Sequence, residues 1–155
     1  MLALRTEEAI PVCQAAIAVA RAAGARAEEA GALDTLACCL DDLGDLDRSL
    51  RLHLEARRLA EAAGADETML RTYLNRTVSL ELAGRGREGI DDAREGLERA
   101  RRLGLERAWG SLVAGNLAWG LLQAGRWAEC DRSPRNCWPG RAGAPSCCTA
   151  PGVRC

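Results

Sequence analysis

The residue with the widest range of possible chemistry is His53, the only histidine of the chain. A Ser-His or Cys-His pair, in which an imidazole activates a nucleophile, would have to include this residue. His53 falls in the middle of a predicted helix, and no nucleophile–base motif accompanies it. The sequence therefore predicts that the protein is not an enzyme.

Four aspartates lie close together in the sequence: Asp41, Asp42, Asp45 and Asp47. An EF-hand calcium loop would need a glycine at its sixth position and a closing glutamate, and this segment has neither. The last two aspartates stand at the start of a predicted helix, where carboxylates cap free N–H groups and interact favourably with the helix dipole. Capping and solvation explain the cluster, so we expect no metal site there.

The cysteines do not form a pattern that holds a metal. Cys38 and Cys39 are adjacent on a predicted helix, so they point to different sides and are expected to be small buried residues. Four more cysteines lie near the end of the chain: Cys137, Cys147, Cys148 and Cys155. They could supply four thiolates, but without a C-x-x-C pair the spacing does not resemble a structural zinc site. We expect no metal and no cofactor.

Residues 131–155 differ in composition from the rest of the chain. They contain four of the five prolines and no Leu, Ile or Met, and they carry four Arg against one acid. We expect a disordered tail after a helical domain of residues 1–130. An alternative is a frameshifted end, because codons for residues 136–139 can contain Leu-Leu-Ala in another frame. The cysteines of the tail would then carry no evolved chemistry.

The composition favours an all-α protein. Hydrophobic residues make up 48% of the chain, mostly Ala and Leu, which are strong helix formers, and Phe is absent. All 21 basic residues are arginines, which excludes a P-loop lysine and Schiff-base chemistry. Because these arginines are interleaved with acids, we expect no direct nucleic-acid binding. Without a signal peptide or a membrane-spanning stretch, we expect a cytoplasmic protein.

Glycines recur with a period of about 40 residues. One set is Gly24, Gly64 and Gly104, and the half-period is marked by Gly44, Gly84 and Gly125. Such a period, with two interruptions in each unit, indicates helix pairs that bury their apolar faces only by stacking on their neighbours. The predicted fold is a short right-handed α-solenoid of about three antiparallel helix pairs.

The first three predicted helices span residues 7–23, 27–43 and 46–63. Within the second of these, apolar residues form a single stripe: Leu33, Leu36, Leu40 and Leu43. Gly64 follows the third helix and is expected at its C′ position, in the left-handed conformation. The same plan repeats up to about residue 130.

Residues 34–56 resemble a tetratricopeptide repeat. The residues that carry this resemblance are Asp34-Thr35-Leu36-Ala37, Leu40, Gly44-Asp45, Ser49-Leu50 and Ala56. They are similar to that family's pattern in the first helix of a repeat (helix A), to its Gly-Asp turn and to its small residues in the second helix (helix B). The resemblance as a whole extends over about residues 7–130. The period is longer than the family's 34 residues. The Ala/Arg/Glu/Leu-rich repeats are also similar to the helical sensor region of large ATP-dependent LuxR-type transcriptional regulators.

The resemblance implies a concave groove lined by the first helix of each pair. The candidate binding residues that it implies are Asp34, Arg71, Asn75, Glu81, Asn116 and Trp119. Asn75 and Asn116 occupy equivalent sites, where they would bond either the backbone of an extended peptide or an adjacent helix. The resemblance also implies a packing role for His53. A lysine-rich clamp for C-terminal carboxylates is excluded, because the chain has no lysine.

These expectations describe a non-catalytic scaffold that binds a protein or peptide and is a fragment of a bacterial transcriptional regulator. Two alternatives remain open: a small-molecule inducer-sensing domain of such a regulator, and a non-functional truncated product. We expect no membrane partner. Exposed apolar faces at the two ends of the array are expected to drive self-association.

Overall fold

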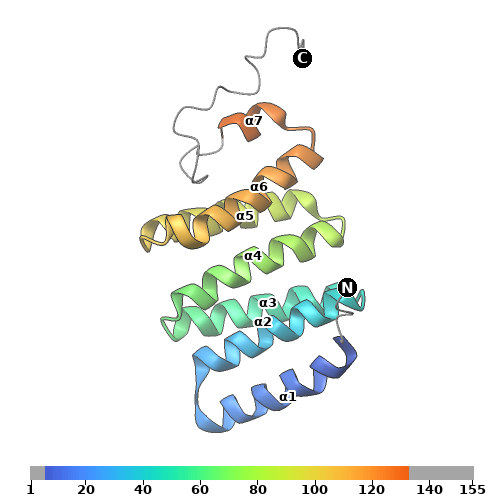
Figure 1. The fold of residues 1–155 in the computed structure, drawn as a ribbon, viewed down its shortest axis with the longest axis vertical. Coiled ribbons are helices and arrows are strands. Elements are labelled where there is room, and N and C mark those ends of the chain that lie inside the picture. The colour runs from blue at the N-terminus through green and yellow to red at the C-terminus, as the bar shows by residue number, and fades with distance from the viewer. Residues whose placement is uncertain (1–5, 133–155) are drawn as a thin grey trace.

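The computed structural model describes residues 6–132. Within this range the regular structure is entirely helical, which confirms the predicted all-α class (Figure 1). The elements are α1 (Thr6–Ala23), α2 (Arg26–Asp42), α3 (Leu46–Ala62), α4 (Asp66–Leu82), α5 (Gly86–Arg102), a π-helical turn (Glu106–Gly110), α6 (Ser111–Gln123) and α7 (Trp127–Arg132). The bounds predicted for the first three helices agree with the structure to within one residue.

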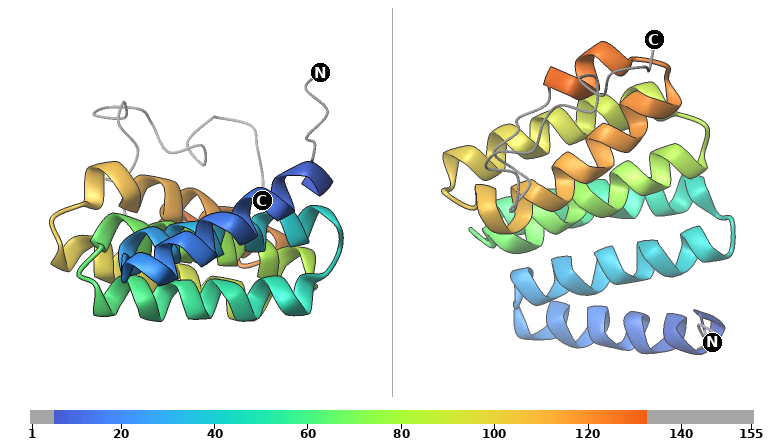
Figure 2. Two further views of the ribbon diagram at one scale, coloured as in Figure 1. Left: turned by 90° about the horizontal axis from the view of Figure 1, so that it is seen from below. Right: turned by 45° about the horizontal axis from the view of Figure 1, so that its top comes forward.

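The helices stack along one axis, each antiparallel to the next (Figures 1 and 2). We call α2, α4 and α6 the A helices, and α1, α3, α5 and α7 the B helices. Successive A helices contact each other, whereas no contact of comparable extent joins successive B helices in the described part of the chain. The array therefore curves toward the surface formed by the A helices, which we call the A face.

Each of the helix boundaries marked by the six periodic glycines has the same geometry. All six glycines have a positive φ, between 66° and 78°. After α3, the N–H of Gly64 donates to the carbonyl of Glu61, and the N–H of Ala65 donates to that of Ala60. These bonds satisfy carbonyls that the helix end leaves free, and they require the left-handed conformation that glycine adopts without strain. The prediction for Gly64 is confirmed.

The predicted side-chain cap at Asp45 is wrong, whereas Asp47 lies in the first turn of α3, where the helix dipole favours it. Asp45 stands at the N-cap of α3, but its side chain makes no capping hydrogen bond. The equivalent N-cap residues are Ala25, Ala65 and Arg85, and they make none either. The glycine turn, rather than side-chain capping, therefore sets where these helices begin.

The third period contains one residue more than the others, and the structure shows where that residue lies. The A helix of this unit opens with the π-helical turn, in which the N–H of Gly110 donates to the carbonyl of Leu105, five residues back. A single inserted residue in a helix is commonly absorbed as a π-turn. The spacing of 41 between Gly84 and Gly125 is thus a local bulge that leaves the helix stack intact.

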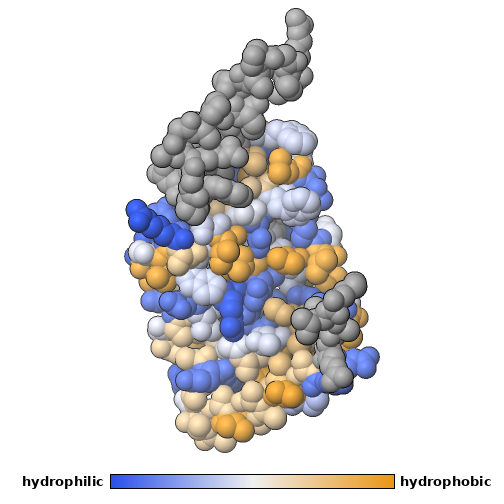
Figure 3. Space-filling model, in the orientation of Figure 1, coloured by the Kyte–Doolittle hydropathy of each residue, from blue (hydrophilic) through white to orange (hydrophobic). Residues whose placement is uncertain are grey.

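Three apolar clusters follow one another along the array. The first contains Leu33, Leu36 and Ala56, the second centres on Leu70 and Tyr73, and the third lies between α5 and α6. Apolar side chains also reach the surface over α4, α6 and α1 (Figure 3). The A face is therefore a mixed polar and apolar surface.

The last described helix is short: α7 runs from Trp127 to Arg132. The predicted tail otherwise lies outside the described residues. None of the described helices combines the length and the apolar character that a membrane span requires.

Candidate functional site

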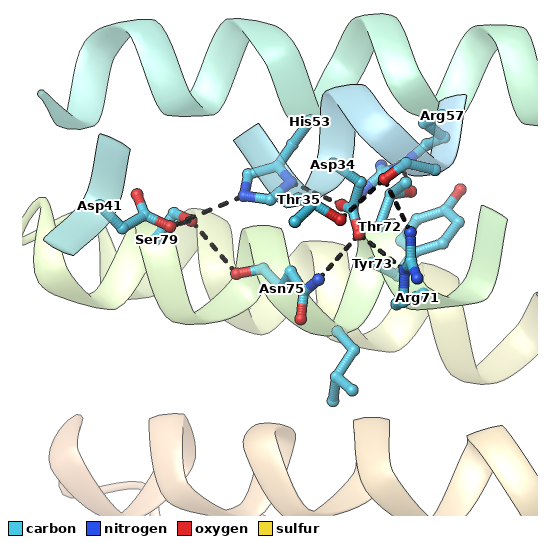
Figure 4. Close-up of polar contacts among 12 residues, drawn as sticks. Asp34, Thr35, Asp41, His53, Arg57, Arg71, Thr72, Tyr73, Asn75 and Ser79 are labelled. Atoms are coloured by element: carbon cyan, nitrogen blue, oxygen red, sulfur yellow. Dashed lines mark hydrogen bonds and ion pairs between the residues drawn. The ribbon is translucent and has the colours of Figure 1, made fainter. Parts of the chain in front are cut away.

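A group of polar side chains is buried where α2, α3 and α4 meet, with Asp34 at its centre (Figure 4). Asp34 is fully buried. Its carboxylate lies 2.8 Å from Nδ1 of His53, and it accepts hydrogen bonds from Nε of Arg71 at 2.9 Å and Nδ2 of Asn75 at 2.8 Å. The carboxylate therefore joins three helices through three donors, which compensates for the cost of burying its charge.

His53 faces a carboxylate at each ring nitrogen. Besides the contact of Nδ1 with Asp34, Nε2 lies 3.7 Å from Oδ2 of Asp41. Burial lowers the pKa of His53, but the hydrogen bonds and negative charges of Asp34 and Asp41 outweigh it, so the pKa is raised above its ordinary value. The imidazole is therefore held in surroundings that favour its charged form.

Asp41 connects this group to the far end of α4. Its Oδ2 accepts a 2.6 Å hydrogen bond from the hydroxyl of Ser79. Burial alone would raise the pKa of Asp41. Its contacts with His53, Ser49 and Ser79 lower the pKa by more than burial raises it, so the net shift is downward. Three buried atoms of this group have no hydrogen-bond partner among residues 6–132: Asp41 Oδ1, Ser49 Oγ and His53 Nε2.

Comparison of repeat positions shows that this group is a local departure from the repeat. The residues equivalent to His53 are Cys13 and Ala93, and Leu74 is equivalent to Asp34. Apolar residues at these positions pack in the core elsewhere in the array. Two polar residues at otherwise apolar positions, 19 apart in sequence, were the signal that sequence reasoning could have used to find the pair.

A second buried ionic group lies one helix further along. Arg57 on α3 forms two hydrogen bonds with Asp92 on α5, at 2.9 and 2.8 Å, and its guanidinium lies 3.5 Å from the centroid of the Tyr73 ring. Arg76 also donates to Asp92, at 2.7 Å. The hydroxyl of Tyr73 donates to Glu95. This group joins α3, α4 and α5 as the first joins α2, α3 and α4.

The two asparagines of the A face have a common orientation. Nδ2 of Asn75 donates to Asp34, and Nδ2 of Asn116 donates to the backbone carbonyl of Leu74 at 3.0 Å. Each side chain is half-buried, and neither amide oxygen accepts a hydrogen bond from the described residues. In Figure 4 the amide oxygen of Asn75 points away from Asp34. Both amides therefore bond a neighbouring helix through nitrogen and keep an acceptor available.

Exposed apolar side chains lie beside these asparagines. Val78 follows Asn75 by three residues and is 47% exposed, and Trp119 follows Asn116 by three residues and is 57% exposed. Leu82 and Leu112 are also exposed on the A helices. The same pair, an amide oxygen with an apolar side chain one helical turn further on, thus occurs in two consecutive repeats.

The predicted site residues lie in three places. Asp34, Arg71 and Asn75 are brought into direct contact, whereas Asn116 and Trp119 lie on the next A helix. Glu81 is half-buried near the end of α4 and lies against Gly86. The expectation that Asp34 lines the groove is wrong, because its carboxylate is fully buried and takes part in the internal group.

The cysteines of the first repeat behave largely as predicted. Cys39 is buried and Cys38 is half-buried. Burial, followed by the charges of Asp34 and Asp41, raises the pKa of the Cys38 thiol to about 12. Reactive cysteines need a lowered pKa, so this thiol has the properties of a structural residue.

One shallow groove lies on the other side of the array, between α1 and α3. It has a volume of about 460 Å³. Ile17, Leu33, Leu36 and Leu52 contribute apolar atoms to it, and Arg21, Arg48 and Glu55 contribute charged groups. Its size is within the range of small-molecule sites.

Comparison with known protein families and curated proteins gives no match. The function must therefore be argued from the residues of the A face and of the buried groups.

Proposed function

We propose that this protein is a non-catalytic scaffold that binds an extended segment of a partner protein along its A face. The observation that carries the proposal is the repeated pair on consecutive A helices, Asn75 with Val78 and Asn116 with Trp119. Each pair consists of an exposed hydrogen-bond acceptor followed three residues later by an exposed apolar side chain. The two pairs lie one repeat apart. An extended segment presents backbone N–H groups and apolar side chains that match such a row.

The geometry of the asparagines favours backbone recognition. Each amide nitrogen is already bonded within the fold, so each side chain is held in place before a partner arrives. Preorganised side chains lose little entropy on binding, and each exposed oxygen can accept one N–H of a partner backbone. Arg71 is bonded to Asp34 and to the carbonyl of Gly31 and contributes a positive edge to this surface.

The proposed partner segment is therefore partly apolar. A lysine-rich clamp on its C-terminal carboxylate plays no part, because the chain has no lysine. Trp119 supplies the largest exposed apolar surface on the A helices, and tryptophan is among the residues that most often dominate binding energy. Val78, Leu82 and Leu112 would complete the apolar contacts.

The experiment is a selection of binding peptides from a random library displayed on phage, followed by affinity measurements with substituted proteins. We expect Trp119→Ala to weaken binding of a selected peptide by about tenfold or more, as for a central interface residue. Trp127→Ala is the matched control, since Trp127 is 68% exposed but lies on α7. Equal effects of the two substitutions, or no selected peptide at all, would contradict the proposal.

A second candidate is a sensor for a small-molecule inducer, favoured by the groove between α1 and α3. Its apolar floor and Arg48 at its edge suit an amphipathic anion, whereas Arg21 is already paired with Glu29 and Glu55. A ligand that binds only the folded state raises the unfolding temperature with concentration. A screen of amphipathic anions by thermal unfolding, repeated with Arg48→Ala, would support this function if a shift appears and the substitution removes it.

We further propose that the chain is a region of a bacterial transcriptional regulator located in the cytoplasm. The support is the resemblance of its long Ala/Arg/Glu/Leu-rich repeats to the sensor region of LuxR-type regulators. Sequencing the gene from codon 120 onward in all three frames tests this. A shifted frame that continues the helical pattern would favour the regulator, and stop codons in the other frames would count against it.

A further inference from the structure

We infer that His53 is a buried imidazolium that bridges Asp34 and Asp41, and that its proton holds Arg71 and Asn75 in place on the A face. His53 is thus a positioning residue: it acts on the surface through Asp34 and does not itself reach a partner. The inference about Arg71 and Asn75 rests on the proposed function of the A face, whereas the charged bridge stands without it.

The geometry favours a proton on both ring nitrogens, although Nε2 makes no hydrogen bond at its 3.7 Å distance from Asp41. Nδ1 lies 2.8 Å from a carboxylate oxygen of Asp34, and Nε2 faces Asp41 at 3.7 Å. A neutral imidazole has one bare nitrogen, whose lone pair would point at one of these two buried carboxylates. Only the imidazolium donates in both directions, and a small rotation of Asp41 would complete the second bond.

The charges around His53 come from two of the helices packed against it. Asp34 and Asp41 lie on α2, together with the half-buried thiol of Cys38, and Arg71 lies on α4. The neutral polar groups nearby are Asn75 and Ser79 on α4, and Ser49 on α3 itself. With His53 charged, two cations balance two carboxylates. With His53 neutral, one buried negative charge is left without a counterion.

The connection to the surface runs through Asp34. One carboxylate oxygen contacts His53, and the other accepts from both Arg71 and Asn75. Loss of the proton at His53 removes a positive charge from beside Asp34 and leaves Asp41 without a counterion. We expect the positions of Arg71 and Asn75 to change with this loss, and both belong to the predicted binding surface.

The test is an NMR titration of the whole chain, which is simple because the chain has a single histidine. We expect the imidazole carbon-bound protons to titrate with a midpoint above 6.5, the ordinary value. The side-chain amide signals of Asn75 should shift with the same midpoint. A midpoint at or below 6.5 would overturn the charged bridge, and an unmoved Asn75 would overturn the link to the surface.

Two substitutions of equal charge change sharpen the titration. Asp41→Asn should lower the midpoint of His53, because it removes one of the two facing carboxylates, while Asp47→Asn should leave it unchanged, because Asp47 is exposed on α3. Circular dichroism establishes that both variants fold. If Asp41→Asn does not fold, the titration of the unsubstituted chain still decides between a charged and a neutral ring.

A binding measurement then separates this inference from the proposed function. A peptide selected on the A face should bind about fivefold more weakly above the midpoint than below it, at the lower end of typical couplings between sites. An affinity that is constant across the midpoint would overturn the link to binding. If no peptide binds, the proposed function fails, and the titration alone decides whether His53 is a charged bridge.

Discussion

At the scale of single residues, the molecule holds its repeats together with buried charge at two junctions. Asp34 is bonded to three side chains on other helices, and Asp92 is bonded to two. Such a pair contributes little relative to apolar packing when complete, but removing one partner leaves an uncompensated buried charge. The two groups are therefore positions where one substitution has a large effect.

The raised pKa of His53 predicts a specific dependence of stability on pH. A group whose pKa is higher in the folded state stabilises fully below its unfolded value of about 6.5, and this contribution is lost as the pH rises through the folded pKa. We expect the free energy of unfolding, measured with urea, to fall as the pH is raised from 6 through that value. The substitution His53→Ala, which copies the equivalent Ala93, should flatten the profile. A profile with the same slope in both proteins would contradict the assignment.

The lowered pKa of Asp41 predicts that the protein loses stability at low pH. Its contribution to stability is present above its unfolded pKa and is lost as the pH falls through its folded one, so the protein should also lose stability in acid, below about pH 4.

A further prediction concerns the ion pair of Arg57 with Asp92. We expect Arg57→Ala to lower the free energy of unfolding by about 3 kcal/mol, as for breaking a buried pair. Arg102→Ala is the control, since Arg102 pairs with Glu98 on the surface of α5, where such pairs contribute about 0.5 kcal/mol. Urea denaturation of both variants gives the comparison. Similar losses would mean that burial of Arg57 has no energetic role.

At the scale of helices, close packing depends on small residues at particular positions. Gly96 on α5 lies directly against Tyr73 on α4, and a Cβ at position 96 would meet the Cβ of Tyr73 at 2.9 Å. At Gly115 on α6, in contrast, an added Cβ would have no neighbouring atom within 4 Å. Two glycines in similar helices thus have different roles.

The corresponding prediction is that alanine has opposite effects at these two sites. Gly96→Ala should destabilise the protein by about 1 kcal/mol or more, because α4 and α5 must move apart. Gly115→Ala should stabilise it by about 0.5–1 kcal/mol, the usual gain from replacing glycine within a helix. Thermal unfolding of the two variants measures both. A gain at position 96 would show that the contact with Tyr73 relaxes without cost.

Much of the fold could be predicted from the sequence because the repeat is written in residues with strong backbone preferences. The spacing of Gly24, Gly64 and Gly104 gave the helix ends. The leucine stripe gave the buried face of α2 except at Leu43, which lies beyond the helix end and is 50% exposed. The site was harder to predict. Asp34 was assigned to the groove because the tetratricopeptide resemblance implies that the first helix of each pair lines it. Only the three-dimensional packing brings His53, Arg71 and Asn75 to Asp34. The π-helical turn was visible as a spacing of 41, but sequence alone does not tell where an extra residue is absorbed.

At the scale of the whole molecule, the first helix of the array leaves an apolar face uncovered. Val12 and Val19 on α1 are 68% and 70% exposed, whereas the equivalent Leu52 and Leu59 on α3 pack against a core cluster. Faces of this kind on helical repeats promote association unless another segment covers them.

Self-association through this face stays a prediction that hydrodynamics can test. We expect the sedimentation coefficient to rise with protein concentration, and the double substitution Val12→Glu and Val19→Glu to reduce that rise. The pair Arg51→Gln and Arg58→Gln, on the exposed side of α3, changes the net charge by the same amount and is the control. A coefficient that is constant over the whole concentration range would contradict the prediction.

The two buried ionic groups also limit how this gene can change by recombination. Uniform glycine turns mean that removing one period, residues 65–104, would join two ends of identical backbone geometry. The product would nevertheless keep Arg57 and lose Asp92, and it would keep Asp34 and lose Arg71 and Asn75. Units that match in length are therefore not exchangeable in position, because each carries the counterions of its own neighbours.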